Sequence, residues 1–323
     1  MASYLGPSTM LLDVALATSA DLPDLYIDDQ LLLAALRHRG LRAESVIWDD
    51  PHIDWSRVGI SVVRSTWDYP ARRGQFIAWA ERVATATDLW NSAAIIRWNT
   101  DKRVYLRDLA RRGVPVVPTI WLDAFSHEDL SALLASCGWR EAVIKPAVSA
   151  SGQDTICVSP HRLAEGQAHL ERLLASGQEV MVQPFFPSIS TQGERSLVFI
   201  DGRYSHTICK RPARGNFLVH EWFGGSIEAV QPTDDERIAA ENVLRALHGP
   251  TLYTRIDFLR DAAGQPQLLE LEVVEPQLYF RYDAHAADRL AEAITARLDA
   301  RAARGGLAAT EFVESLNAIP QYT

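Results

Sequence analysis

Short apolar runs alternate with longer amphipathic stretches along the first part of the chain. Residues 11–16 and 58–63 are apolar and carry β-branched side chains, which predicts two buried strands. Between them, residues 28–40 place their apolar side chains on one helical face and end at Gly40, a typical helix terminator. A second helix is predicted from about residue 72 to residue 86. This alternation predicts a small α/β unit with a parallel sheet.

The pattern changes after residue 97. Thr100 is expected to be the N-cap of a new helix, with Asp101 complementing the helix dipole and Gly113 ending the helix. Beyond it, short strands follow one another as hairpins, and Asp201–Gly202 is a dipeptide that a tight hairpin turn favours. Strands are predicted at residues 142–147, 154–159, 179–186, 195–200, 204–210, 251–259 and 267–275, and further helices near 233–248 and through the 280s and 290s.

These elements divide the chain into three expected units. Residues 1–97 would form an N-terminal α/β domain, and residues 98–182 and 183–323 would form two α+β lobes. The expected fold class is therefore α/β plus α+β.

Composition narrows the class of protein. The chain has 323 residues, of which 47% are hydrophobic and 23% charged, a balance typical of a soluble globular protein. Its formal net charge of −9 argues against broad nucleic-acid binding, and no apolar run reaches the roughly 20 residues that span a bilayer. Cys137, Cys157 and Cys209 are widely separated and lie in apolar surroundings. We expect buried thiols in a reducing cytoplasm, without disulfides or a zinc site.

The strongest candidate site is acidic. Asp257 lies in one predicted strand, and Glu270 and Glu272 lie in the next. Side chains at positions i and i+2 of a strand point to the same face, so the two glutamates converge and the hairpin can bring Asp257 beside them. Such a cluster inside apolar strands calls for a divalent cation, and oxygen ligands favour magnesium. The alternative is an exposed sheet edge with solvated acids.

Two lysines could supply the complementary charge. Lys145 lies within an otherwise apolar strand, where an unpaired ammonium group is costly, and Lys102 opposes the dipole in the first turn of a helix. Taken singly, either could be a surface lysine with only its stem buried. The loop 148–153 contains Ser151 and Gly152, and its small residues would let backbone N–H groups close around phosphates. An ordinary hairpin loop is the alternative.

A basic cluster follows further along the chain. It contains Lys210, Arg211 and Arg214 and ends at Asn216. Arginines bind carboxylates and phosphates through two parallel hydrogen bonds, so the cluster predicts an anion contact. A solvated loop is the alternative.

In this order, the motifs resemble the ATP-grasp superfamily, in particular its glutathione-synthetase-like branch. The similarity covers about residues 95–295 and is carried by VMVQPFFPSISTQGERSLVFIDG, CKRPARGNF and LELEVVEP. It implies an ATP-grasp fold with an N-terminal Rossmann-like pre-ATP-grasp domain and two lobes that clasp ATP and Mg²⁺.

The resemblance also implies roles for individual residues. ATP contacts would come from Lys102, Lys145, Ser151, Gly152, Gln183, Pro184, Phe185, Phe186 and Glu194. Catalytic stabilisation of the transferred phosphoryl group would come from Lys145, Lys210 and Arg214, and the magnesium ligands would be Asp257, Glu270 and Glu272. The branch usually carries asparagine where this chain has Glu272, so the number of bound ions stays open.

The N-terminal segments are more particular. WDDPHIDW, VVRSTWDYP and RWNTDKR are similar to the ATP-grasp ligases of D-cycloserine biosynthesis, which close a ring from O-ureido-D-serine. RSTWDY follows a predicted strand, and open α/β sheets bind ligands at the carboxyl ends of their strands. The expected substrate contacts are Arg64, Ser65, Trp67, Asp68, Tyr69 and Asn216. The alternative is a stable turn with Trp67 in the core.

Together these features predict a cytoplasmic, magnesium- and ATP-dependent ligase. A carboxylate or ureido oxygen of a small amino-acid-like substrate would be phosphorylated, and an amine of the same molecule would capture the activated carbon with release of phosphate. An intermolecular ligase for amino acids, dipeptides or peptides is one alternative, and a non-catalytic nucleotide-binding protein is another. The family further implies a homo-oligomer, without nucleic-acid or membrane partners.

Overall fold

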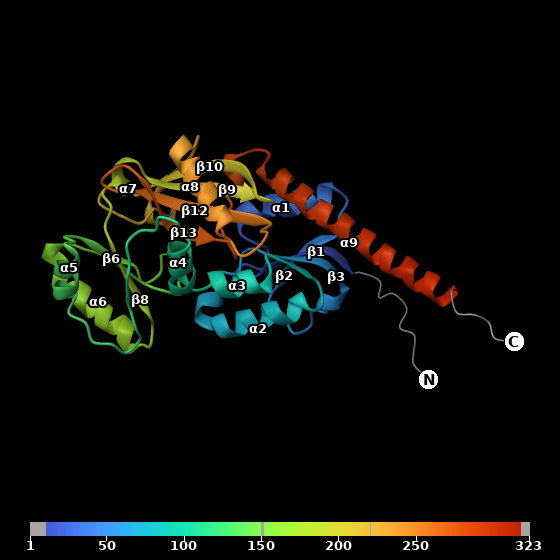
Figure 1. Ribbon diagram of the computed structural model, residues 1–323, viewed down its shortest axis with the longest axis horizontal. Coiled ribbons are helices and arrows are strands. Elements are labelled where there is room, and N and C mark those ends of the chain that lie inside the picture. The colour runs from blue at the N-terminus through green and yellow to red at the C-terminus, as the bar shows by residue number, and fades with distance from the viewer. Residues whose placement is uncertain (1–10, 150–151, 220, 318–323) are drawn as a thin grey trace.

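The computed structural model describes residues 11–317 apart from residues 150–151 and 220. Within this part of the chain the strands form three sheets, one of five strands and two of four. The five-stranded sheet lies in the middle of an elongated molecule, with one four-stranded sheet at each side (Figure 1). Each sheet is built from one continuous stretch of the chain.

The N-terminal sheet has the strand order β2–β1–β3–β4, and all its strands are parallel. Side chains alternate across β1, so that Val14 and Leu16 pack with α1 while Ala15 and Ala17 face the tryptophan-rich core under α2. The two helices therefore cover opposite faces, which confirms the predicted α/β unit. The elements are β1 (Leu12–Thr18), α1 (Ile27–His38), β2 (Ala43–Ile47), β3 (Val58–Val63), α2 (Arg73–Ala84), β4 (Asp88–Trp90) and α3 (Ala93–Asn99).

The second sheet has the order β5–β8–β6–β7 and is antiparallel. Its apolar side chains, including Ile144 and Val182, form one core with Leu134 of α5 and Leu170 of α6. The elements are α4 (Lys102–Arg111), β5 (Ile120–Leu122), α5 (Leu130–Cys137), β6 (Ala142–Pro146), β7 (Ile156–Val158), α6 (Leu163–Ala175) and β8 (Val180–Pro184).

The third sheet has the order β11–β10–β9–β12–β13 and is also antiparallel. The turn between β9 and β10 has a positive φ at both Asp201 (51°) and Gly202 (70°), as the sequence predicted for a tight hairpin. The elements are α7 (Ser188–Thr191), β9 (Glu194–Ile200), β10 (Arg203–Arg211), β11 (Ser226–Val230), α8 (Asp234–Arg245), β12 (Tyr253–Arg260), β13 (Pro266–Glu272) and α9 (Ala286–Asn317).

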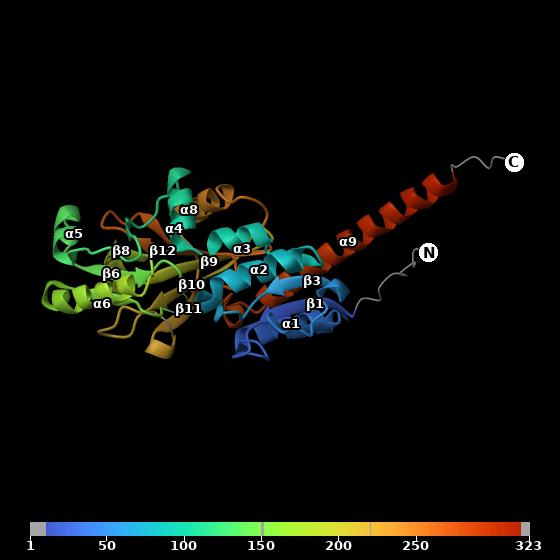
Figure 2. The ribbon, with the colours of Figure 1, turned by 90° about the horizontal axis from the view of Figure 1, so that it is seen from below.

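The N-terminal sheet and the central sheet share a hydrophobic core. Val62 of β3, Val198 of β9 and Tyr253 of β12 belong to one cluster of buried side chains, together with Leu290 and Ile294 of α9. The first turns of α9 thus close this junction, and the helix then continues away from the body (Figures 1 and 2). None of the described helices is long and apolar enough to cross a membrane.

Three local predictions were wrong. The N-cap of α4 is Asp101, whose carboxylate accepts hydrogen bonds from the backbone N–H groups of Arg103 and Val104; Thr100 instead ends α3. The strand expected at residues 154–159 is only β7, because the chain is still turning up to Asp154, whose φ is 52°. Cys137 is exposed at the end of α5, whereas Cys209 is buried.

Candidate active site

One cavity is lined by residues of the second and third sheets and by residues that follow β3 of the N-terminal sheet. Trp67 and Tyr69 come from the N-terminal unit, Lys145 from β6, Glu194 from β9 and Lys210 from β10. The hairpin β12–β13 supplies the acidic side chains of the lining, and the segment after β13 closes the cavity on the N-terminal side.

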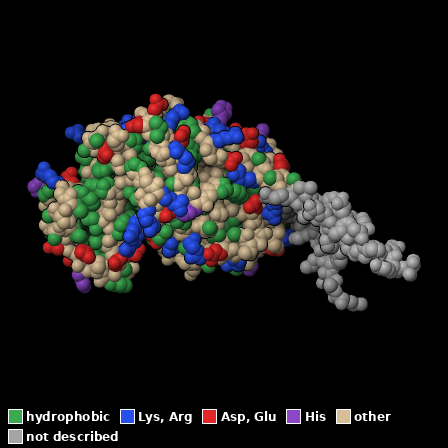
Figure 3. Space-filling model, in the orientation of Figure 1, with side chains coloured by type: hydrophobic (Ala, Val, Ile, Leu, Met, Phe, Trp, Pro, Cys, Tyr) green, Lys and Arg blue, Asp and Glu red, His purple; other side chains and the backbone are tan. Residues whose placement is uncertain are grey.

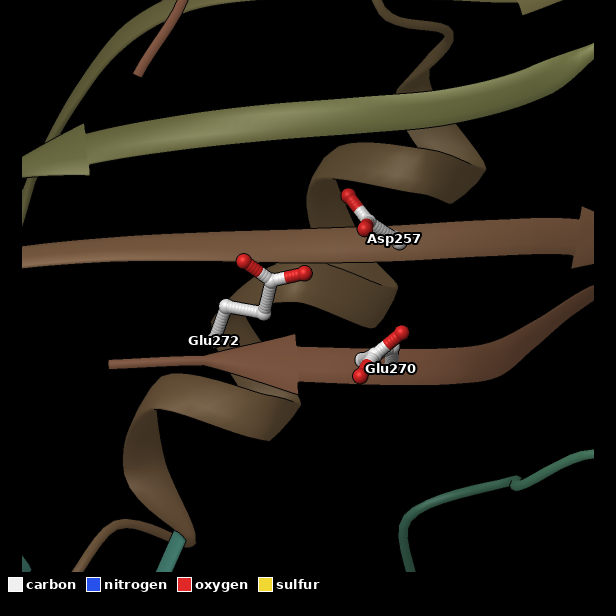
Figure 4. Close-up of side chains that lie close together, drawn as sticks. All are labelled: Asp257, Glu270 and Glu272. Atoms are coloured by element: carbon white, nitrogen blue, oxygen red, sulfur yellow. The ribbon is translucent and has the colours of Figure 1, made fainter. Parts of the chain in front are cut away.

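The three predicted acidic residues lie together at this cavity. Asp257 on β12 stands opposite Glu270 on β13, and Glu272 follows two residues later on the same face. One ligand oxygen from each carboxylate lies within 4.8 Å of the others. Figure 4 shows the three side chains on one side of the hairpin. The alternative of solvated acids at an exposed edge does not hold for Asp257, which is 1% exposed.

Cations surround this acidic group. Arg255 stands opposite Glu272 in the hairpin; its guanidinium group lies 2.8 Å from an oxygen of Asp257 and also pairs with Glu272. The Nζ atom of Lys102 lies 3.0 Å from an oxygen of Glu270. The acids are therefore held in place by paired cations, and their closely spaced oxygens fit a magnesium ion.

These contacts shift the pKa values of the carboxyl groups in different directions. Burial alone would raise the pKa of Asp257, but the charges of Arg255 and Lys210 outweigh it and lower that pKa. Burial raises the pKa of Glu272 to about 8 against the attraction of Arg255, and raises the pKa of Glu275 to about 7. Asp257 thus stays ionised in the folded protein, while Glu272 and Glu275 titrate near neutral pH.

The chain contains only three lysines, and all three line this cavity. Lys210 pairs with Glu194 and lies 3.5 Å from Asp257, and Lys102 pairs with Glu270. Lys145 has no ion pair within 4.0 Å among the residues that the structure describes, and burial lowers its pKa. A buried ammonium group that faces an open cavity without a counter-charge is a suitable partner for a phosphate.

The residues expected to contact ATP lie at the same cavity, with one gap. Gln183, Pro184, Phe185, Phe186, Glu194 and Gly152 line it, whereas Ser151 lies outside the described residues. The Gln183 side chain is held by Thr119, to whose hydroxyl oxygen it donates at 3.0 Å. Glu194 is buried and paired with Lys210, so its carboxylate is fixed by that lysine in the structure.

Several predicted substrate contacts are not part of the cavity lining. Arg64 is fully buried and donates to the Asp29 carboxylate at 2.7 Å, and the Ser65 hydroxyl donates to the same carboxylate at 2.8 Å. Asp68 accepts hydrogen bonds from Trp48 and Arg72. The polar atoms of these side chains already have hydrogen-bond partners within the protein, because the strand end that carries them is covered by the central sheet.

Arg214 and Asn216 are also absent from the lining. The side chain of Arg214 is exposed, and that of Asn216 accepts hydrogen bonds from the backbone of its own turn, at Phe217 and Leu218. Of the predicted substrate residues, only Trp67 and Tyr69 line the cavity.

Among the lining residues that the sequence analysis did not name are the polar side chains of Arg255, Glu275, Gln277 and Tyr279. Arg255 precedes Asp257 by two positions, so strand alternation alone could have placed both on one face. The rarity of lysine was a second signal, because all three lysines of the chain line the cavity. No periodic pattern marks residues 275–279, because this segment is neither helix nor strand.

The chain is similar to proteins of D-cycloserine biosynthesis. Residues 14–91 match the family described as the N-terminal domain of D-cycloserine synthetase DcsG. The cycloserine biosynthesis protein DcsG of Streptomyces lavendulae is 36% identical over 296 residues, which cover 88% of this chain and 98% of that protein. A crystal structure of D-cycloserine synthetase DcsG superposes with a TM-score of 0.79 at 35% identity and covers 88% of this chain and 99% of the other.

More distant similarity extends to other ligases. A protein of Teredinibacter turnerae named "Probable alpha-L-glutamate ligase" is 27% identical over 175 residues, which cover 50% of this chain and 56% of that protein. A D-alanine–D-alanine ligase from Bacillus anthracis, solved with ATP, has a TM-score of 0.65 at 15% identity over 89% of this chain and 97% of its own, a likeness of fold alone.

Proposed function

The chain belongs to the ATP-grasp ligase family of D-cycloserine synthetase, and on that premise we propose that it activates a small amino-acid-like substrate for intramolecular ring closure, as in D-cycloserine formation from O-ureido-D-serine. As a member of this family it is an ATP-dependent ligase. The observation that carries the proposal is the cavity itself, which is lined both by Lys145 of β6, without an ion pair, and by the acids Asp257, Glu270 and Glu272 of β12 and β13.

The proposed reaction has two steps. A carboxylate or ureido oxygen of the substrate attacks the γ-phosphorus of ATP, and ADP leaves. A nitrogen of the same molecule then attacks the activated carbon and loses a proton as phosphate departs. With O-ureido-D-serine that nitrogen must also lose its carbamoyl group, which leaves with one water molecule as carbon dioxide and ammonia. Magnesium held by Asp257, Glu270 and Glu272 would neutralise charge on the phosphates, and Lys145 and Arg255 would donate hydrogen bonds to the transferring group.

Two features support a cytoplasmic enzyme without nucleic-acid partners. All three cysteines are free, as expected in a reducing compartment. Acidic and basic side chains are interspersed over the face drawn in Figure 3, and the formal net charge is −9.

The test is release of ADP and phosphate from Mg-ATP with a panel of small amino acids. The panel contains O-ureido-D-serine, its L-enantiomer, D- and L-serine and common dipeptide partners. We expect release with O-ureido-D-serine alone, at a rate that added amines do not change. Release that requires a second amine would instead assign the enzyme to intermolecular ligation, the reaction class suggested by the glutamate ligase similarity. No substrate-dependent release across the panel would contradict the proposal.

A further inference from the structure

The segment that follows the metal hairpin is held by an unbroken series of side-chain hydrogen bonds. Each backbone carbonyl oxygen from residue 273 to residue 278 accepts one such bond, with donor–acceptor distances between 2.6 and 3.1 Å. In chain order the donors are Asn91, Tyr253, Trp67, Arg64, Arg255 and His206. These hydrogen bonds hold in place a segment that has no regular secondary structure.

This series gives the N-terminal motif RSTWDY a role different from the one its sequence suggested. Arg64 donates to the carbonyl of Pro276 at 2.7 Å, and the indole of Trp67 donates to the carbonyl of Glu275 at 3.0 Å. Both residues therefore position the segment instead of binding a ligand through their polar atoms. What the segment presents to the cavity is the side chains of Glu275, Gln277 and Tyr279.

Glu275 differs from the other carboxylates of the cavity lining. Glu194, Asp257, Glu270 and Glu272 each have a lysine or arginine within 4.0 Å. For Glu275, the described residues provide no such cation within 4.0 Å. Its carboxyl group has hydrogen bonds with the side chain of Tyr69 and with its own backbone N–H, and Lys102 acts on it from a longer distance.

A second polar group of the lining lies two residues further along the chain. The amide nitrogen of Gln277 is buried and makes no hydrogen bond of good geometry among the described residues, and its side chain interacts with the hydroxyl of Tyr26. The segment after β13 therefore offers the cavity one carboxylate without an ion pair within 4.0 Å and one amide donor. The same cavity is lined by Lys145 of β6.

From this geometry we infer that Glu275 binds the α-ammonium group of an amino-acid substrate and so selects substrates that carry a free amine. The inference rests on the proposed function, because it names the group by which the same cavity recognises its substrate. The aromatic side chains of Trp67 and Tyr69 would flank the ammonium group, and the amide of Gln277 would donate to a substrate oxygen.

This assignment has a chemical consequence for ring closure. An amine that is held as an ammonium ion has no free electron pair and cannot attack the activated carbon. Glu275 would thus keep the α-amine out of the reaction and leave capture to the other nitrogen. Burial raises the pKa of Glu275 although the charge of Lys102 lowers it, so the arrival of a closer ammonium group would favour the ionised form.

The experiment compares kcat and KM for O-ureido-D-serine and for its analogue that lacks the α-amine, with wild type, Glu275→Gln and the control Glu292→Gln. Glu292 is exposed on α9, so the control makes the same chemical change away from the cavity. Wild type and control are expected to prefer the amine by roughly 10- to 100-fold in kcat/KM, the range of one charge-assisted hydrogen bond. In Glu275→Gln this preference is expected to fall to about onefold, with KM for ATP unchanged.

Each other outcome contradicts the inference in a distinguishable way. Equal preference for the amine in Glu275→Gln and wild type would overturn it while leaving the proposed function intact. A higher magnesium requirement in the variant, with amine preference kept, would make Glu275 part of the metal site. Absence of turnover by wild type with every amino acid would remove the proposed function and the inference together.

A second variant distinguishes the loss of the negative charge from a folding defect. Glu275→Asp keeps the charge on a shorter side chain, and we expect it to keep the preference for the amine with a smaller rise in KM. Binding of Mg-ATP and the unfolding temperature are measured for every variant. Loss of the preference in Glu275→Asp with full retention in Glu275→Gln would also overturn the inference.

Discussion

Lys145 and Glu275 are the two charged side chains of the cavity lining to which the described residues offer no ion pair. Their charges are opposite; Lys145 lies on β6, and Glu275 lies in the segment that follows β13. The remaining charges of the lining compensate one another through Lys102, Lys210 and Arg255. A phosphate would compensate the charge of Lys145, and an ammonium group would compensate the charge of Glu275. ATP supplies the phosphate, and an amino acid supplies the ammonium group.

Replacement of Lys145 by methionine removes the free cation while keeping a flexible apolar stem. We expect substrate-dependent ADP release to fall by at least about a hundredfold, because one donor to the transferring phosphoryl group is lost. The chain has no lysine outside the cavity, so Arg245→Met on the exposed face of α8 is the control. Full turnover in Lys145→Met would remove this residue from the mechanism.

The raised pKa of Glu275 also predicts a pH-dependent change in the free energy of unfolding that does not depend on substrate. Its pKa of about 7 lies above the ordinary value of 4.5, so between these pH values the folded state binds more protons than the unfolded state. The contribution of Glu275 to the free energy of unfolding is therefore full below about pH 4.5 and is lost as the pH rises through 7. Glu275→Gln mimics the protonated form and should exceed wild type by on the order of 1–3 kcal/mol at pH 8.

Denaturant unfolding at pH 5 and pH 8 measures this difference. The two proteins should agree at pH 5 and separate at pH 8. A constant difference at both pH values would show that the raised pKa of Glu275 does not contribute to the pH dependence of stability.

Among the elements, the β9–β10 hairpin sets the position of two charged residues in the cavity. Gly193 precedes β9 with a φ of +80°, and a Cβ atom there would lie 2.8 Å from the backbone oxygen of Lys210. The chain can pass this point only without a side chain, and this close approach brings Glu194 opposite Lys210.

Gly193→Ala should therefore lower the free energy of unfolding by about 2–3 kcal/mol and reduce turnover. Gly202→Ala is the matched control, since it shares a positive φ (+70°) but has no atom within 4 Å of the added Cβ. It should cost about 1 kcal/mol and leave turnover unchanged. Chemical denaturation of both variants, with ADP release alongside, checks the prediction. Equal costs for the two substitutions would mean that the contact with Lys210 is relieved by a small shift.

At the scale of the whole molecule, the cavity exists because the N-terminal sheet is joined to the central sheet. Besides the shared hydrophobic core, Asn91 links the two sheets with three hydrogen bonds, to the backbone of Leu252, Tyr253 and Val273. Asn91 is fully buried, so its removal would leave three backbone groups without partners.

Asn91→Ala should lower the free energy of unfolding by on the order of 3–5 kcal/mol, because each unpaired buried group costs about 1–3 kcal/mol. Asn242→Ala, on an exposed position of α8, is the control and should change stability by less than about 0.5 kcal/mol. Equilibrium unfolding in urea distinguishes the two. If Asn91→Ala unfolds at the same urea concentration as the control, the hydrogen bonds across the junction do not hold the sheets together.

The local pattern of the sequence determined much of this protein. Period-two and helical patterns predicted the main strands and helices, and the spacing of Glu270 and Glu272 predicted a common face with Asp257, because both follow from geometry within a few residues. Resemblance to a family supplied the ATP-grasp fold and the ligase activity. The division at residues 97 and 182 stays a prediction.

The tertiary structure alone decided which polar residues reach the cavity. Arg64 and Glu275 are 211 positions apart in the sequence. Arg64 turned out to hold the segment that presents Glu275 to a ligand, while the sequence placed Glu275 only at the end of a predicted strand and gave it no site role. The physical reason is that a guanidinium group needs hydrogen bonds and a counter-charge whether it is buried in the protein or binds a ligand. Only the packing of one sheet against another determines whether protein groups or a ligand meet that need.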